Sequence, residues 1–264
     1  MTMAPSKQDD ARLKGEARRQ KILSMVQAQK SVSLTQLTTE LNVSRMTIHR
    51  DLDVLESRGL LRKQRGGVTA ESSLLFESNF HYRRQTDEGA KRELARAAVA
   101  LIEPGNVIML DESTTTLMMC NYLEAIENVT VISNSLAVCD RLRDVANVHL
   151  VITGGDYNDT HQSFSGLVCE NVIGQLRSDW AFLSAASVIG ECLFHQDQDI
   201  LRVKRAFMQA SERTALLLTA GKFRTRALNQ FAELSEFDHI LISKTLDETI
   251  ASQLHQTALS FKLI

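Results

Sequence analysis

The sequence predicts an α/β protein with a small, mainly helical N-terminal domain and a larger C-terminal domain that contains a mostly parallel sheet. Three short segments with apolar side chains at helical spacing lie within residues 16–70. Over residues 89–264, apolar runs rich in β-branched residues alternate with helical stretches, which is typical of a parallel sheet covered on both faces. Residues 71–88 are polar and mixed in charge, and we expect a linker that packs against another part of the chain.

The composition is that of an ordinary soluble protein. Of the 264 residues, 44% are apolar and 23% are charged. No apolar run is long enough to span a membrane, and the polar start of the chain lacks the apolar core of a signal peptide. The seven histidines and four cysteines show no H-x-H, H-E-x-x-H or C-x-x-C spacing. We therefore expect a cytoplasmic protein with reduced thiols, no metal and no cofactor.

The net charge of −2 hides a difference between the two parts of the chain. Residues 1–70 hold 13 Lys and Arg against 7 Asp and Glu, a balance of +6. The remaining residues hold 17 against 25, a balance of −8, and the two balances give −2. A basic N-terminal part on an acidic body indicates a polyanionic partner for the N-terminal part alone.

Three helices are expected in the N-terminal part. Ser33 and Ser44 stand where the N-caps of the second and third helices are needed, and Gly59 closes the third helix. The basic stretch that follows, "LLRKQRGGV", predicts a short strand and turn. The apolar positions that pack the three helices are Ile22, Leu23 and Val26, then Leu34, Leu37 and Leu41, then Ile48, Leu52 and Leu55.

The third helix and the basic turn predict a double-stranded DNA partner. Burial of Ile48, Leu52 and Leu55 leaves cations and hydroxyls on the other side of the helix, where they suit a major groove. A capped helix N-terminus also favours a phosphate. These charges could instead be a solvated surface, but their combination with three helices and a glycine turn favours DNA. The expected DNA-binding residues are Ser44, Arg45, Met46, Thr47, His49, Arg50, Arg62, Lys63, Arg65, Gly66 and Gly67.

The C-terminal part alternates strands with helices. The expected strands are Val107–Leu110, Val129–Ser133, Leu150–Thr153, Trp180–Ser184, Leu216–Thr219 and Ile240–Ile242. The expected helices are Lys91–Ile102, Thr115–Ile126, Ser135–Arg143, Leu167–Leu176 and Ile200–Ser211.

Polar junctions follow three of the expected strands. The first, "LDESTTT", places two acids and four hydroxyls where a buried strand turns into a helix. Ligands of open parallel sheets bind beyond the carboxyl ends of the strands, and hydroxyls at a helix N-terminus favour anions. The alternative is that Ser113 to Thr116 only cap a helix. The expected effector-binding residues are Asp111, Ser113, Thr114, Thr115, Thr116, Asn134, Ser135, Gly154, Gly155 and Lys222, with Ser113, Thr114 and Thr115 facing a phosphate.

The chain resembles the DeoR family of bacterial transcriptional regulators. "LNVSRMTIHRDLDVLESRGLL" and the Gly66-Gly67 turn match its winged helix-turn-helix. The stretches that look like its sensor domain are "FHYRR", "LIEPGNVIMLDESTTT", "VTVISNSLAV", "VITGG", "SFSG", "VKRAFM" and "GKF". His49 departs from the family's Arg-Arg-Asp run, Gln64-Arg65 from its Val-His, Ser113 from its usual glycine, and Thr219-Ala220-Gly221 from its Asp-Ser-Ser.

The resemblance implies a fold and a function. The fold is a winged helix-turn-helix followed by a domain similar to ribose-5-phosphate isomerase. The function is regulation of carbohydrate genes, chiefly as a repressor that a phosphorylated sugar or polyol releases from its operator. An isomerase-like enzyme that carries a DNA-binding domain is the alternative, and a DNA-binding scaffold without a ligand is a third possibility. Because one winged helix reads few base pairs, we also expect a homodimer or a higher even homo-oligomer.

Overall fold

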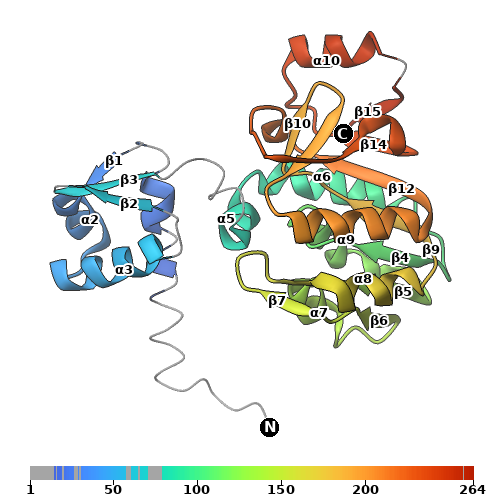
Figure 1. Cartoon of the computed structure of the whole chain (residues 1–264), viewed down its shortest axis with the longest axis horizontal. Coiled ribbons are helices and arrows are strands. Elements are labelled where there is room, and N and C mark those ends of the chain that lie inside the picture. The colour runs from blue at the N-terminus through green and yellow to red at the C-terminus, as the bar shows by residue number, and fades with distance from the viewer. Residues whose placement is uncertain are drawn as a thin grey trace. The chain divides into compact units, whose positions relative to one another are not determined.

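The computed structural model describes residues 15, 17–19, 21–26, 29, 31–57, 61–64, 66–70, 79–257 and 259–264. The chain divides into an N-terminal unit, Met1–Glu77, and a C-terminal unit, Ser78–Ile264 (Figure 1). The first eight residues of the expected linker, 71–78, lie outside the described residues. Its remainder forms helix α5 (Phe80–Gln85) and the turn into helix α6 (Glu88–Val99), both in the C-terminal unit.

The N-terminal unit packs helices against a three-stranded sheet. Residues 17–19 and 21–26 are helical, and helices α2 (Leu34–Leu41) and α3 (Arg45–Ser57) follow. Strands β1 (Ser31–Ser33), β2 (Leu61–Gln64) and β3 (Gly67–Ala70) are antiparallel in the order β1-β3-β2. The predicted caps are confirmed: Ser33 accepts a hydrogen bond from the amide of Gln36, and Ser44 from that of Thr47. The core includes Ile22, Leu23, Val26, Leu37, Ile48, Leu52 and Leu55, as predicted, together with Val32, Leu61 and Val68.

The C-terminal unit is built on a seven-stranded sheet in which every pair of neighbours is parallel. Its order is β15-β14-β12-β9-β4-β5-β6. The predicted α/β fold class is confirmed, and β4 and β5 have the predicted bounds. The strands are β4 (Val107–Leu110), β5 (Val129–Ser133), β6 (Val148–Ile152), β9 (Ser178–Leu183), β12 (Ser211–Leu218), β14 (His239–Ile242) and β15 (Phe261–Leu263).

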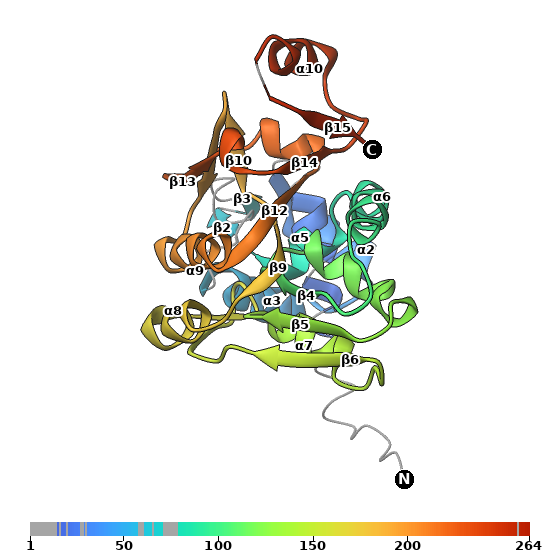
Figure 2. The same ribbon diagram turned by 90° about the vertical axis from the view of Figure 1, so that its right-hand side faces the viewer.

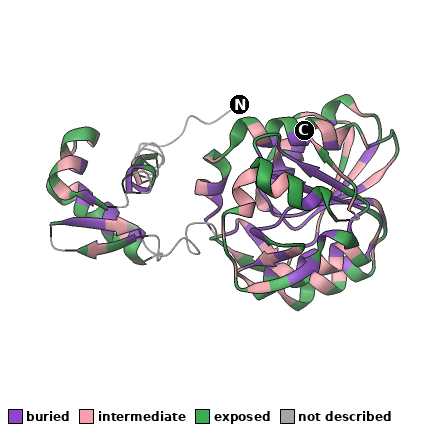
Figure 3. Cartoon of the chain, turned by 90° about the horizontal axis from the view of Figure 1, so that it is seen from above, coloured by how far each residue is buried: buried purple, intermediate pink, exposed green. Residues whose placement is uncertain are grey.

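Helices cover both faces of this sheet (Figure 2). Met109 of β4 joins the core under α8 (Gly166–Gly174) and α9 (Gln198–Gln209), whereas its neighbours Ile108 and Leu110 join the core under α6 and α7 (Leu136–Leu142). This alternation is what a strand buried on both faces requires. Figure 3 shows the buried residues gathered in the strands between the helical layers.

Smaller elements complete the C-terminal unit. Helix α10 (Glu248–His255) precedes β15. Two smaller sheets pair β7 (Asp156–Asn158) with β8 (Ser163–Ser165), and β10 (Ser187–Ile189) with β11 (Cys192–His195) and β13 (Asn229–Glu233). Short 3₁₀ helices are η1 (Thr116–Asn121), η2 (Leu123–Ala125), η3 (Ala220–Phe223) and η4 (Leu234–Glu236). Within the described part of the chain, no helix has the length and apolar character to cross a membrane.

One predicted helix was wrong. The α-helix expected at Thr115–Ile126 is replaced by η1 and η2. The Thr116 hydroxyl bonds the backbone carbonyls of Asp111 and Ser113 at 3.2 and 3.0 Å, and such local side-chain bonds compete with a regular helix. The backbone then continues with bonds to the third residue back, as from the Tyr122 amide to the Met119 carbonyl.

Candidate functional site

Helix α3 presents the expected DNA-facing side chains to solvent. Arg45, Met46, His49 and Arg50 are exposed, with Met46 64% accessible, while Ile48 on the opposite face is fully buried. Ser44 is exposed at the start of the helix, and its hydroxyl lies 2.9 Å from that of Thr47. The helix therefore has the geometry that reading of a major groove requires, with a capped N-terminus and long polar side chains over its first two turns.

A buried acid holds the back of α3. Asp51 is 3% exposed and accepts hydrogen bonds from Arg18 at 2.5 and 3.2 Å and from Arg19 at 3.2 Å. Because Asp51 follows Arg50 directly, this ion pair fixes the rotation of α3 about its axis. The sequence analysis missed this role, although the charges that meet there are visible in the sequence.

The turn between β2 and β3 differs in detail from the expectation. Arg62 is exposed, but Lys63 is paired with Asp53 and with Glu56 of α3, the latter at 3.2 Å. The hydrogen bond that Lys63 donates to Asp53 raises the pKa of Lys63, against the opposing effect of desolvation. Lys63 thus binds the acidic flank of α3 in the free protein. Arg65 lies outside the described residues.

The two glycines of this turn have separate structural reasons. Gly66 has φ +86°, which favours glycine. Gly67 is buried, and a Cβ atom there would lie 2.5 Å from the carbonyl oxygen of Val32 in β1. Gly67 therefore serves the close packing of β3 on β1, and Gly66 is the member of the pair that is exposed to a partner.

In the C-terminal unit, the carboxyl ends of the strands form one edge of the sheet, which we call the rim. The three predicted junctions lie on it side by side, because β4, β5 and β6 are neighbours. Leu110 is in register with Ser133, and Ser133 with Ile152. The chain order reverses between β4 and β9, so the rim beside β4 is the switch point at which such sheets bind ligands.

The first junction is a tight turn, residues 111–116, which we call the polar turn. All six of its side chains are buried. Oδ1 of Asp111 accepts from the Ser113 amide at 3.0 Å and from the Thr116 hydroxyl at 2.7 Å. The Ser113 hydroxyl lies 2.8 Å from that of Thr116 and accepts from its amide at 3.1 Å. The hydroxyls of Ser113 and Thr116 therefore make hydrogen bonds within the turn itself. A 3₁₀ helix, not an α-helix, begins at Thr116.

The other two junctions lie beside the polar turn. Asn134 donates to the Phe164 carbonyl at 2.9 Å, and Ser135 caps α7 through the Val138 amide at 3.4 Å. Gly154 and Gly155 have φ of +66° and +117°. A Cβ atom at Gly155 would lie 2.5 Å from the Ser165 carbonyl oxygen, so this glycine lets β6 pass close to the end of β8.

A lysine that the site prediction omitted occupies the interior behind the polar turn. Nζ of Lys204, on α9, donates to Asp111 Oδ2 at 2.5 Å and lies 3.0 Å from Glu112 Oε1. The Ser184 amide donates to the same Asp111 oxygen at 2.9 Å. Desolvation disfavours the charged forms of Lys204 and Glu112. The carboxylates of Asp111 and Glu112 nevertheless raise the pKa of Lys204. The charges of Lys204, Arg83 and His161 lower the pKa of Glu112. We call Asp111, Glu112 and Lys204 the buried ion cluster.

Two histidines border the buried ion cluster. His161 lies 3.4 Å from Asp197 Oδ2, and the rings of His161 and His195 are 5.4 Å apart. The hydrogen bond from His161 is the main cause that lowers the pKa of Asp197 to about 2. Burial, followed by the charge of Lys204, lowers the pKa of His195 well below its usual value. Cations and carboxylates from four separate segments thus converge at the switch point.

Four buried polar atoms around this cluster lack a hydrogen-bond partner among the described residues. They are Glu112 Oε2, Asn134 Oδ1, His161 Nδ1 and Ser163 Oγ. The backbones of residues 135 and 163 form a β-bridge, and the charges of His161 and Glu112 interact, which brings the four residues to the same end of the sheet. Buried polar atoms are almost always paired in native proteins, and these four open positions suit hydrogen bonds from a polar ligand.

Lys222 is placed differently from the other expected effector residues. It lies half-buried on η3, after β12. Strand β9 separates β12 from β4, so the two strand ends are roughly 10 Å apart at ordinary strand spacing. The residues that follow Lys222 line a cavity of about 730 Å³ between β10, η3 and α10.

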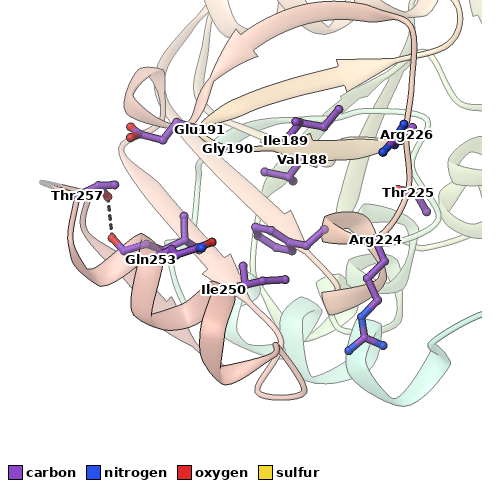
Figure 4. Close-up of a pocket in the computed structure, with 12 residues that line it drawn as sticks. Val188, Ile189, Gly190, Glu191, Arg224, Thr225, Arg226, Ile250, Gln253 and Thr257 are labelled. Atoms are coloured by element: carbon purple, nitrogen blue, oxygen red, sulfur yellow. Dashed lines mark hydrogen bonds between the residues drawn. The ribbon is translucent and has the colours of Figure 1, made fainter.

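That cavity is mainly apolar. Figure 4 shows Val188, Ile189 and Ile250 between Glu191 on one side and Arg226 on the other. The residues expected to bind the effector do not line it. Its composition suits an apolar ligand or side chain better than a polyol. In the described part of the chain, no group of three or more His, Cys, Asp or Glu side chains could hold a metal ion.

The fold and the two sites together define a DNA-binding regulator with a ligand-sensing domain. The match to family models identifies the family: residues 18–73 match the DeoR-like helix-turn-helix domain, and residues 86–244 match the DeoR C-terminal sensor domain. The chain belongs to the DeoR family, as its sequence motifs predicted. These proteins are transcriptional regulators and not enzymes.

Characterised and uncharacterised relatives span nearly the whole chain. YgbI of Escherichia coli, an uncharacterised HTH-type transcriptional regulator, is 34% identical over 92% of this chain and 95% of its own. The L-fucose operon activator of Haemophilus influenzae is 30% identical over 89% and 94%. The glycerol-3-phosphate regulon repressor of the same species is 29% identical over 86% and 89%.

The C-terminal unit is also similar to solved sugar-phosphate enzymes. Ribose 5-phosphate isomerase A of Methanocaldococcus jannaschii matches with a TM-score of 0.38 and 18% identity, over 52% of this chain and 55% of that one.

Proposed function

We propose that this protein represses carbohydrate genes and leaves its operator when a phosphorylated sugar or polyol binds at the rim of the sensor domain. The observation that carries the effector site is the set of open acceptors around the buried ion cluster. A sensor domain gains little stability from burying such charges, since apolar side chains of similar volume serve a core at least as well. Hydroxyl groups of a polyol donate the hydrogen bonds that Glu112 Oε2 and Asn134 Oδ1 lack.

The relatives support the direction of regulation and the class of ligand. One relative is a repressor whose name includes a phosphorylated polyol, glycerol 3-phosphate. Another is an activator, that of the L-fucose operon. We assign repression because the resemblance to the family implies it and the glycerol-3-phosphate regulon repressor is one of the relatives. The expected effector residues of the three junctions, with Lys222, form the proposed site.

We further propose that the regulator acts on double-stranded DNA in the cytoplasm as a homodimer or a higher even homo-oligomer. One α3 helix covers a single half-site, and two copies are needed to read a symmetric operator. The contact between copies is assigned to residues 89–264, which leaves the DNA-binding domain, residues 16–70, free to reach the groove. Light scattering at working concentration should give an even multiple of the chain mass.

Operator release tests the proposed function. Immobilised operator DNA, selected from a random pool with the full-length protein, is loaded at low salt and washed with a panel of sugar phosphates and polyol phosphates. At least one compound should release the protein and should be recovered unchanged by NMR. Release by none of them would remove the proposed effector class, and conversion of the compound would favour the isomerase-like alternative.

A further inference from the structure

A small polar cavity opens beside the polar turn. It encloses about 200 Å³, and its lining includes Thr114 and three arginines from three helices: Arg84 of α5, Arg92 of α6 and Arg141 of α7. We call it the arginine cavity. The predicted effector site included none of these arginines, although Arg84 ends the stretch "FHYRR", which resembles the family's sensor domain. We propose that the arginine cavity is an anion subsite, which holds the phosphate of the effector.

The charges in the cavity favour an anion. Against the three guanidinium groups, the lining offers one carboxylate, Glu88, which pairs with Arg92 at 2.7 Å. Arg141 donates to the Asn121 side chain at 3.3 Å, a neutral partner. Arg84 makes no salt bridge with any residue that the structure describes. An excess of two positive charges therefore faces the cavity, and guanidinium groups are the side chains that bind phosphate oxygens with two hydrogen bonds.

The arginine cavity and the buried ion cluster share the polar turn, so this inference rests on the proposed function. Thr114 lines the arginine cavity, and Glu112, two residues earlier, belongs to the buried ion cluster. Two residues of extended chain span at most about 7 Å. A ligand with a phosphate at one end and several hydroxyls at the other can thus place its phosphate among the arginines and its hydroxyls toward Glu112.

This placement differs from the role expected of Lys222. The end of β12, where Lys222 lies, is separated from the polar turn by β9. Arg84, Arg92 and Arg141 instead line the same cavity as Thr114. The structure therefore assigns the phosphate to three arginines outside the predicted effector site, and the phosphate contact of the polar turn to Thr114.

Inorganic phosphate is the first probe. Its binding to the full-length protein is measured by calorimetry at constant ionic strength, for the wild type and for Arg84→Gln and Arg141→Gln. Each variant should weaken binding roughly tenfold or more, because a hydrogen bond between charged groups is lost. Arg143→Gln is the matched control, since Arg143 is exposed at the end of the same α7 but pairs with Asp140 and Asp144 outside the cavity. Unchanged affinity in both variants, or an equal loss in the control, would overturn the proposal.

A second measurement separates this inference from the proposed function. A polyol phosphate that releases the wild type from its operator is compared with the same polyol without phosphate. The Arg84 and Arg141 variants should need about tenfold more of the phosphorylated compound and should respond to the free polyol as the wild type does. If they respond normally to the phosphorylated compound, the phosphate lies elsewhere while the regulator proposal stands. If no compound releases the wild type, the proposed effector class fails, and the effector role of the cavity fails with it.

Discussion

The ammonium group of Lys204 and the carboxylate of Asp111 meet at 2.5 Å across 93 positions of sequence, with both side chains 1% exposed or less. The same carboxylate accepts a hydrogen bond from the Ser184 amide at the end of β9. This pair therefore joins α9 to the ends of β4 and β9 at the switch point. Glu112 places a second carboxylate beside the same cation. Two buried carboxylates therefore depend on Lys204 for their neutralisation.

Replacing Lys204 should strongly destabilise the sensor domain. Lys204→Met leaves two buried carboxylates without their cation, and breaking a buried pair in this way costs roughly 3–5 kcal/mol of unfolding free energy. Urea unfolding of the full-length protein measures the loss. Arg202→Met is the control on the same helix, because its pairs with Glu170 and Asp199 are exposed and are worth less than about 1 kcal/mol. An equal loss of unfolding free energy in the two variants would contradict the claim that burial makes the Lys204 pair the stronger one.

Stability should fall as the pH drops below neutrality. Burial and Lys204 lower the pKa of His195 well below 6.5 in the folded chain, so the unfolded chain binds more protons between the two values. The contribution is complete above pH 6.5 and is lost as the pH falls toward the lowered value. Urea midpoints at pH 7.5 and 5.0 should show this decrease, and His195→Gln should reduce it. A full decrease in His195→Gln would assign the effect to another group.

Operator recognition should depend on Arg50. Arg50→Ala removes an exposed side chain from the DNA-facing side of α3, and the loss of one good base contact costs about 1–3 kcal/mol of discrimination. Fluorescence anisotropy with the selected operator and with a sequence altered at single positions measures both affinity and preference. Circular dichroism should show the fold intact. If affinity and preference both stay at wild-type values, Arg50 has no part in reading the operator.

The rotation of α3 should depend on Asp51. Asp51→Asn weakens the bonds from Arg18 and Arg19 and leaves two cations without their acid, at a cost of roughly 2 kcal/mol, less than for a fully buried pair because both arginines are partly exposed. Hydrogen exchange at the amides of Ile48 and Leu52 measures the local loss. Asp53→Asn, an exposed acid two residues later, should leave exchange almost unchanged.

Induction should require Thr114. Thr114→Ala should leave operator binding intact but block release by the effector, because a hydrogen-bonding group in the arginine cavity is lost. Lys222→Ala tests the residue that the sequence analysis paired with it. Ile250→Trp, which partly fills the large apolar cavity, should release normally. Loss of release in the Ile250 variant, with a normal response from the Thr114 variant, would move the effector site to the apolar cavity.

The sequence predicted six of the seven strands of the main sheet, missing β15 and the strands of the two smaller sheets, and it predicted the polar turn only in part. Runs such as Val107–Leu110 are apolar on both faces and of strand length, so their bounds follow from the pattern. The helix expected after the polar turn failed because its hydroxyls bond the local backbone. The hydroxyls themselves divide into structural ones, Ser113 and Thr116, and Thr114, which lines a cavity. Composition alone could not make that division.

Long-range charge pairs were beyond prediction for a physical reason. Lys204 and Glu112 approach only because α9 packs over the end of β4, and nothing in the residues near either side chain encodes that contact. Lys63 was expected on DNA and is instead paired with Asp53, because strand β2 packs beside α3. A single sequence shows which charges exist, whereas the fold decides which of them meet.

The hairpin of the DNA-binding domain is built into the domain rather than attached to it. Strand β3 lies between β2 and β1, β1 runs directly into α2, and the Leu34 amide donates to the Gly66 carbonyl at 3.0 Å. We therefore expect the β2–β3 hairpin and α3 to meet DNA as one surface. Little conformational entropy of the hairpin should then be lost on binding. Operator affinity should then respond to salt through the number of phosphate contacts, with only a small contribution from ordering of the hairpin.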